Sequence, residues 1–219
     1  MKRKSKVCFW IAGGLLAIFA VWTVLVRFVD LRAIGPEGSK VGFATLNGFV
    51  HRLTGENLFL YDLTDMLSII PLGFVAGFGI LGLVQWIKRK KLLSVDYSIL
   101  VLGGFYIVVM ALYLMFEVVV INYRPLLIEG VLEVSYPSST TMLVLCVMPT
   151  AAMQLGSRIK KALPKYLVIA AIVLFTAFMV VGRLISGVHW FSDIIGGLFL
   201  SSGLVMTYCA VCGLNVNKH

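Results

Sequence analysis

The chain has 219 residues, of which 60% are hydrophobic and only 13% are charged, and its mean hydropathy is +0.98. Soluble proteins carry roughly 25% charged residues, so this composition excludes an ordinary soluble globular domain. The formal charge of +9 does not indicate a nucleic-acid partner, because the basic residues stand in short clusters between apolar runs. We therefore expect the lipid bilayer to surround most of the chain.

Six apolar runs are each long enough to cross about 30 Å of hydrocarbon as a helix. In chain order they are Val7–Val29, Met66–Ile87, Val95–Val120, Ser138–Leu155, Tyr166–Leu184 and Trp190–Gly213. The first run is longer than the roughly 7–15-residue apolar region of a signal peptide, so we interpret it as a retained span. We find no repeat or low-complexity segment that divides the chain. The sequence thus predicts one all-α domain over residues 1–219, a polytopic bundle of six transmembrane helices.

The basic residues predict how this bundle is oriented. Thirteen of the 19 Lys and Arg residues lie at the chain start, after the second span, after the fourth span or near the chain end. They are Lys2, Arg3, Lys4, Lys6, Lys88, Arg89, Lys90, Lys91, Arg158, Lys160, Lys161, Lys165 and Lys218. Cytoplasmic loops collect Lys and Arg, so we expect both termini in the cytoplasm. The small size and basic inner loops fit a bacterial inner membrane.

The first outer connection, Asp30–Asp65, is long and contains an amphipathic stretch. Within Val41–Leu60, apolar residues recur at roughly helical spacing. We expect this stretch either to lie along the membrane interface or to cap the outer end of the bundle. The other outer connections run from about Ile121 to Pro137 and around Ser186–Val188.

Charged and hydroxyl side chains gather at the outer ends of the later spans. Charged groups are costly near membrane depth, which makes them candidates for function. The candidates are Glu117 and Arg124 around the end of the third span, Ser138, Ser139, Thr140 and Thr141 at the start of the fourth, and Arg183, His189 and Asp193 where the fifth joins the sixth. All of them reach the same predicted face, so we expect them to form one site.

These residue types suit the binding of a phosphoryl group. Arg124 and Arg183 supply planar, permanently charged forks that match phosphoryl oxygens. Ser138 is a good N-cap, and the free N–H groups of a helix start bind anions. His189 and Asp193 are four residues apart and would share one helix face. A carboxylate there can hold one imidazole nitrogen and leave the other free to attack or to accept a proton.

The motifs resemble those of the type 2 phosphatidic acid phosphatase family, whose members are six-span lipid phosphatases. The family pattern is Lys, six residues, Arg-Pro; then Pro-Ser-Gly-His; then Ser-Arg, five residues, His, three residues, Asp. The chain has matching residues in the same order and at the same spacings, namely Arg124, Pro125, Pro137, Ser138, Arg183, His189 and Asp193. Because the motifs fall on the same three helix ends, the resemblance covers roughly the whole chain.

The resemblance implies a role for each matching side chain on the extracytoplasmic face. His189 would be the nucleophile that forms a phosphohistidine, and Asp193 would orient it. Arg124, Arg183 and Ser138 would bind the phosphate of a membrane lipid. Such enzymes need no metal and no cofactor, and we see no cluster of metal ligands in the sequence.

Four positions depart from the family pattern, and three of them are expected beside the substrate. Glu117 replaces the lysine, Ser139 the glycine, Thr140 the second-motif histidine and Gly182 the serine before the arginine. Thr140 cannot protonate the leaving group, a contribution typically worth about 10²–10⁴-fold. A diphosphate lipid expels a phosphate monoester, which needs less protonation than an alkoxide does. An isoprenoid diphosphate such as undecaprenyl diphosphate is therefore the expected substrate, in preference to a simple phosphomonoester.

Two further side chains could compensate for the missing acid. Glu117 could donate a proton from a semi-buried position, or it could pair with Arg124 or Arg183, and the ion pair is the interpretation we favour. His51, on the first outer connection, could instead fold over the site.

Three functions fit the sequence. The first is a phosphatase that acts on an isoprenoid diphosphate or a related lipid phosphate. The second keeps the histidine chemistry but transfers the phosphoryl or head group to an acceptor other than water. The third is a protein that only binds or moves a phosphorylated lipid, or supports a partner enzyme. Retention of His189 and Asp193 favours covalent chemistry, whereas loss of the acid and the lysine favours a binding protein. The sequence does not indicate an oligomeric state.

Overall fold

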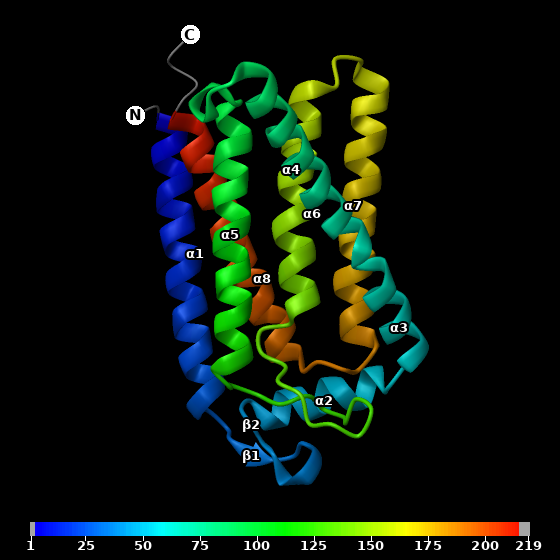
Figure 1. The fold of residues 1–219 in the computed structure, drawn as a ribbon. Coiled ribbons are helices and arrows are strands. Elements are labelled where there is room, and N and C mark those ends of the chain that lie inside the picture. Colours follow the sequence, from blue (N-terminus) through cyan, green and yellow to red (C-terminus); the bar gives the residue numbers. More distant parts are fainter. Residues whose placement is uncertain (1–2, 215–219) are drawn as a thin grey trace.

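The computed structural model of the chain describes residues 3–214 and contains six helices long and apolar enough to cross a membrane (Figure 1). The spans are α1 (Arg3–Phe28), α3 with α4 (Leu58–Leu67 and Ile69–Arg89), α5 (Tyr97–Val118), α6 (Ser139–Arg158), α7 (Ala162–Ile185) and α8 (Phe191–Leu214). The predicted all-α, six-span class is confirmed. Lys2 and Lys218, which contributed to the predicted orientation, lie outside the described residues.

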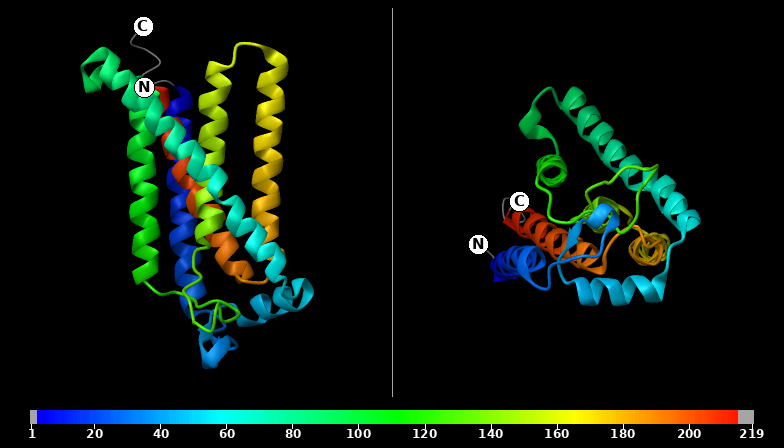
Figure 2. Two further views of the ribbon diagram at one scale, coloured as in Figure 1. Left: turned by 45° about the vertical axis from the view of Figure 1, so that its right-hand side comes forward. Right: turned by 90° about the horizontal axis from the view of Figure 1, so that it is seen from below.

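The second span starts earlier than predicted, because the end of the outer connection continues it as a separate helix. The helices α3 and α4 meet at Ser68, whose N–H donates to the carbonyl of Asp65 at 3.0 Å. Pro71 has no N–H to offer the carbonyl of Leu67, so the helical ladder is interrupted at this point. The combined segment crosses the bundle at a steep tilt (Figures 1 and 2). This tilt brings α3 against α7.

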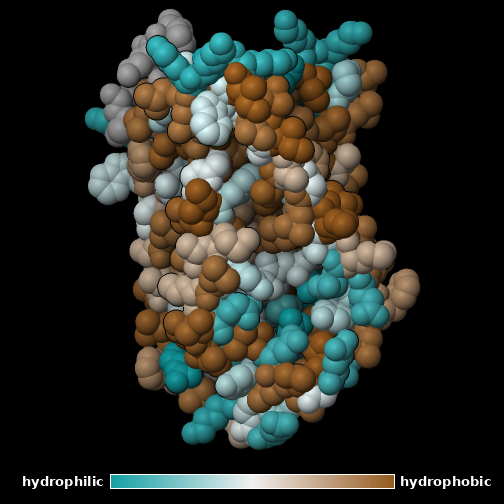
Figure 3. All heavy atoms as spheres, in the orientation of Figure 1, coloured by the Kyte–Doolittle hydropathy of each residue, from teal (hydrophilic) through white to brown (hydrophobic). Residues whose placement is uncertain are grey.

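The helices α6 and α8 are the most buried of the spans in the described part of the chain. The first span packs along α8, while α5 also contacts α8 and both α4 and α7 contact α6. Large apolar side chains remain exposed on the outer helices. They form a broad hydrophobic band between two more polar ends (Figure 3). A band of this kind suits contact with lipid tails.

The contact between α1 and α8 depends on a small residue. A side chain placed on Gly203 of α8 would put its Cβ 2.8 Å from the side chain of Leu16 on α1. Without a hydrophobic force between helices in lipid, close packing through small residues holds such pairs together.

The predicted amphipathic stretch of the first outer connection is helical in two parts. Its first part is α2 (Ala44–Thr54), which lies across the end of the bundle and contacts α8 (Figure 1), and its second part opens α3. A short antiparallel hairpin of β1 (Arg32–Ala33) and β2 (Lys40–Val41), with the 3-10 turn η1 (Pro36–Gly38) between its strands, precedes α2.

The two ends of the bundle differ in charge. One end carries the start of α1 and the α4–α5 connection with its 3-10 turn η2 (Leu92–Ser94), and most of the predicted basic clusters lie there (Figure 1). Asp96 at this end pairs with Arg89 at 3.0 Å and Arg158 at 3.8 Å. The opposite end, called the site end below, carries the hairpin, α2 and the predicted polar cluster.

Replacement of Gly203 by Val should push α1 away from α8, because the added side chain would overlap Leu16. Overpacking of this kind typically costs about 1–3 kcal/mol. Thermal unfolding of the detergent-solubilised protein should therefore show a lower midpoint. Gly13→Val in α1 is the matched control, because nothing lies within 4 Å of a Cβ at that position. An equal loss in both variants would contradict this account of the helix contact.

Candidate active site

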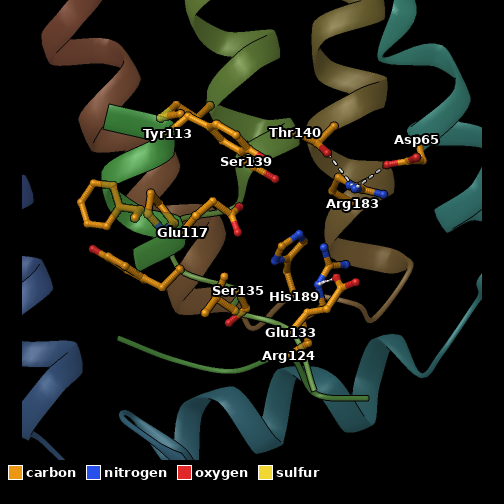
Figure 4. Close-up of a pocket in the computed structure, with 15 residues that line it drawn as sticks. Asp65, Tyr113, Glu117, Arg124, Glu133, Ser135, Ser139, Thr140, Arg183 and His189 are labelled. Atoms are coloured by element: carbon orange, nitrogen blue, oxygen red, sulfur yellow. Dashed lines mark hydrogen bonds and ion pairs between the residues drawn. The ribbon is translucent and has the colours of Figure 1, made fainter. Parts of the chain in front are cut away.

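A cavity of about 430 Å³ opens at the site end between the ends of α5, α6 and α7 (Figure 4). The connection from α5 to α6 and the loop from α7 to α8 complete its walls. Its charged and hydroxyl-bearing lining residues are Asp65, Tyr113, Glu117, Arg124, Glu133, Ser135, Tyr136, Ser139, Thr140, Arg183 and His189. Three helix ends that are distant in sequence thus meet around one space.

His189 projects into this cavity from the loop between α7 and α8 (Figure 4). The side chain is 3% exposed, and neither ring nitrogen has a hydrogen-bond partner in the described residues. Burial lowers the pKa of His189 well below its usual value, and the positive charges of Arg124 and Arg183 lower it further. The imidazole is therefore neutral near pH 7, and one ring nitrogen carries a free lone pair.

Arg183, at the end of α7, is held by three neighbours on α3 and one on α6. Its Nη2 donates to Thr140 Oγ1 at 2.7 Å and pairs with Asp65 Oδ1 at 3.2 Å. Its Nη1 donates to the carbonyl of Tyr61 and to Thr64 Oγ1, both at 3.3 Å. The Nε atom has no acceptor in the described part of the chain. One N–H of this buried guanidinium is therefore available to a ligand.

Arg124 lies on the connection between α5 and α6, where its N–H donates to the carbonyl of Glu133 at 2.9 Å. Its Nε lies 3.0 Å from Glu133 Oε2, but the carboxylate is off the N–H direction, so the contact is a charge pair without a hydrogen bond. The buried Nη1 has no partner among residues 3–214. The ring of Tyr61 lies 5.8 Å from the guanidinium of Arg124 and 4.9 Å from that of Arg183. Tyr61 therefore contacts both cations through its π face.

The start of α6 divides its hydroxyl groups between capping and the cavity. Ser138 is the N-cap, and its side chain accepts from the N–H of Thr141 at 3.4 Å. Ser138 does not line the cavity, whereas Ser139 and Thr140 do. A direct contact between the Ser138 hydroxyl and a bound phosphate, as expected from the motif, therefore has no support in this arrangement.

The expected hydrogen bond between Asp193 and His189 is absent from the described structure. Asp193 Oδ1 accepts from Asn122 Nδ2 at 3.0 Å and Ser192 Oγ at 3.3 Å, and Oδ2 accepts from the Trp190 N–H at 3.0 Å. The helix α8 begins at Phe191, so His189 precedes it and the pair does not have helical i,i+4 geometry. Asp193 instead caps its own helix and fixes the backbone immediately after His189.

Two expectations for side chains near the missing acid are corrected, namely the ion pair of Glu117 with an arginine and the placement of His51 over the site. Glu117 pairs with neither arginine in the described residues, because Glu133 and Asp65 occupy those positions. Its carboxylate points into the cavity from α5 and faces His189 (Figure 4). His51 does not line the cavity but lies outside it, with Nε2 3.2 Å from the carbonyl of Gly187.

Sequence reasoning missed the residue that fastens α2 to α8. Asn47 is fully buried, and its Oδ1 accepts from the Ser192 N–H at 3.0 Å. Its Nδ2 donates to the carbonyl of Gly42 at 2.7 Å and to Ser192 Oγ at 2.9 Å. A signal was present, because Asn47 lies four residues after Phe43 and three before Val50, in the middle of an apolar helical stripe.

The chain matches the PAP2 superfamily over residues 72–216. It belongs to this superfamily. Its fold is similar to a crystal structure described as that of the first transmembrane PAP2 type phosphatidylglycerolphosphate phosphatase from Bacillus subtilis. That likeness has a TM-score of 0.59 and 19% sequence identity, and it covers 96% of this chain and 98% of the other. A comparison with curated protein sequences finds no match.

The departures from the PAP2 pattern have visible structural consequences. Thr140, at the position of the second-motif histidine, accepts a hydrogen bond from Arg183. A Cβ on Gly182 would lie 2.8 Å from the Thr64 side chain, so the glycine lets α3 approach closely enough for Thr64 to reach Arg183. The serine of the family pattern would disturb this approach.

Replacement of Asn47 by Ala should destabilise the protein, because it leaves the Ser192 N–H and the Gly42 carbonyl without a partner. Each buried polar group left unsatisfied costs roughly 1–3 kcal/mol. The measurement is the thermal unfolding midpoint of the detergent-solubilised chain. Arg52→Ala, at an exposed position of the same helix, serves as the control and should leave the midpoint nearly unchanged. A midpoint equal to that of the unmodified protein would show that Asn47 does not hold α2 in place.

Proposed function

We propose that this chain dephosphorylates a membrane lipid phosphate through a phosphohistidine formed on His189. One observation carries the proposal. A buried, neutral imidazole without a hydrogen-bond partner in the described residues shares a cavity with two buried arginines, each of which has an unpaired N–H. Unsatisfied buried groups of this kind are costly in a protein unless a ligand completes them. A phosphoryl group would accept hydrogen bonds from the arginines while its phosphorus faces the imidazole.

The proposed reaction has two steps. In the first, the lone pair of one His189 nitrogen attacks phosphorus, and the bond between phosphorus and the lipid oxygen breaks. The leaving oxygen then takes its proton from water. In the second, water attacks the phosphohistidine and releases inorganic phosphate, which restores the imidazole. Arg124 Nη1 and Arg183 Nε would stabilise the charge on the transferred group. Because His189 is the nucleophile, this scheme needs no metal and no cofactor.

Asp193 would act in this scheme as a positioning residue. Its contact with the Trp190 N–H and its support from Asn122 fix the chain just beyond His189. Histidine orientation would then come from the loop backbone and from burial, instead of from a direct carboxylate–imidazole bond.

A second cavity supports a lipid as the substrate. It measures about 370 Å³, is mostly apolar, and lies between α4, α5 and α6. It shares Tyr113, Ser139, Thr140 and Met142 with the first cavity. A phosphoryl head in the first cavity could therefore continue into an apolar tail in the second. The site end lies opposite most of the basic clusters, which supports an extracytoplasmic site, in a bacterial inner membrane as the sequence predicts.

The leaving group has to compensate for the missing acid. Thr140 cannot give a proton, so a leaving oxygen of low basicity is needed. The isoprenoid diphosphate expected from the sequence meets this requirement, because its leaving group is itself a phosphate. A phosphate ester with a positive charge near the leaving oxygen also meets it.

Replacement of His189 by Ala should abolish phosphate release from lipid phosphates. It should also abolish formation of the covalent phosphoenzyme, which as a phosphohistidine is labile to acid and stable to alkali. The reason is that the attacking nitrogen is gone. His51→Ala is the matched histidine control, because this side chain lies outside the cavity; it should still form the phosphoenzyme, even if loss of its contact with the Gly187 carbonyl lowers the rate. If the unmodified protein forms the phosphoenzyme but passes the phosphoryl group only to an added alcohol, its function is phosphoryl transfer and not hydrolysis. Full biological activity of His189→Ala would indicate a lipid-binding function.

The pH dependence of kcat/KM should reflect the lowered pKa of His189. A solvent-exposed histidine becomes protonated, and loses its lone pair, as the pH falls through about 6.5. His189 stays neutral through that range, so activity should persist at pH 6.5 and fall only at lower pH. Arg124→Gln removes one of the charges that lower the pKa, and the acid limb should move upward. An acid limb centred at 6.5 or above in the unmodified protein would contradict the proposed nucleophile.

A further inference from the structure

The charges around the candidate active site are arranged in two layers. The guanidiniums lie at the bottom of the cavity, where the side chains of Arg124 and Arg183 are 10% and 2% exposed. Their acidic partners lie at the rim, with Glu133 41% and Asp65 59% exposed. Glu117 is also exposed and points into the same cavity from the opposite wall (Figure 4). A buried cationic floor is therefore surrounded by an acidic rim.

The acids outnumber the cations of this lining. Three carboxylates (Asp65, Glu117 and Glu133) face two guanidiniums, and His189 is neutral. The lining thus carries one more negative than positive charge before any ligand binds. A phosphate dianion would increase that excess, and a second phosphate would increase it further. Like charges repel each other more strongly in a partly buried site than in water. This arrangement opposes a diphosphate and favours a ligand that brings a positive charge of its own.

Glu117 is the acid best placed to meet such a charge. It forms no ion pair within residues 3–214, whereas Asp65 and Glu133 each have an arginine. Tyr113, Phe116 and Tyr136 line the same cavity. A cavity lined by a carboxylate and aromatic side chains is a favourable environment for an organic ammonium ion.

We propose that the lipid head carries an ammonium group as well as the phosphoryl group, and that Glu117 binds this ammonium at the rim. The substrate class is then an amino-alcohol phosphate lipid, in which the amine lies a few bonds from the phosphate. The inference rests on the proposed function, because it assigns the second half of the same ligand. An ammonium ion near the leaving oxygen also lowers the basicity of that oxygen. The amine thus meets the leaving-group requirement that the loss of the acid creates.

The test compares two lipids that differ at the amine, one with a free ammonium group and one with an uncharged acetamide. Sphinganine 1-phosphate carries both groups, and its N-acetylated derivative keeps the phosphate but loses the ammonium. For phosphate release by the full chain in nanodiscs, kcat/KM should be about tenfold higher for sphinganine 1-phosphate than for its acetylated derivative. This is the ratio expected when a lipid cation lies near several partly exposed carboxylates.

Glu117 variants assign this preference to one side chain. Glu117→Gln should reduce the preference about three- to fivefold, the upper part of the range expected for loss of a single exposed ion pair. Glu117→Lys, which restores the residue of the family pattern, should favour the acetylated lipid. Glu37→Gln, an exposed acid of η1 outside the cavity lining, is the control and should keep the preference of the unmodified protein.

Two outcomes would overturn the inference while the proposed function stands. One is equal hydrolysis of both lipids by the unmodified protein. The other is an equal slowing of both lipids by Glu117→Gln, which would make Glu117 a proton donor to the leaving group.

Binding of the two corresponding non-hydrolysable phosphonates separates the inference from the proposed function. In one outcome no lipid releases phosphate, yet the amine phosphonate binds more tightly than the acetylated phosphonate and Glu117→Gln loses this preference. The phosphatase proposal then fails, whereas the ammonium subsite remains. Equal binding of both phosphonates would exclude the subsite.

Discussion

The energetically most costly feature of this structure is the burial of two guanidiniums and an imidazole around one small cavity. Each cation would be unfavourable at this depth without compensation, since removal of a charge from water costs several kcal/mol even after relaxation. Arg183 and Arg124 therefore each have a carboxylate neighbour and lie against the ring of Tyr61. Burial lowers the pKa of His189, and the same positive charges lower it further, so the imidazole stays neutral. The placement of α3, of the α5–α6 connection and of the rim acids follows from the need to compensate these cations.

The histidine loop is held from the side opposite the cavity. The N–H of Asn57 donates to the carbonyl of Ser186 at 3.0 Å, and His51 lies against the carbonyl of Gly187. Gly187 has a φ of +73°, and a Cβ there would lie 2.2 Å from the carbonyl oxygen of Gly55, so only glycine fits this turn. Together with the contacts of Asn47 to Ser192, these bonds make the connection between α1 and α4 a structural support for the site.

Much of the fold and part of the site were predictable from the sequence. The six spans were predictable, because the thickness of the hydrocarbon layer sets the length of an apolar helix that crosses it. The convergence of Arg124, Arg183 and His189 followed from their positions at span ends on one face. The ion-pair partners were not predictable, because Asp65 reaches Arg183 only through the tilt of α3. The spacing of His189 and Asp193 was misleading, because a helical spacing has meaning only when both residues lie in the helix.

The approach of α3 to α7 at Gly182 has a consequence for how this protein can diverge. Tyr61, Thr64 and Asp65, which surround Arg183, precede residue 72, where the match to the superfamily begins. The motif residues thus lie within the matched segment, whereas Asp65, which contributes to the charge of the rim, lies before it. Under the proposed function, changes in α3 would alter which head groups are accepted while the motif residues remain the same. Comparison of motifs alone would not detect such a change, so substrate preference in related chains has to be sought in the first seventy or so residues as well.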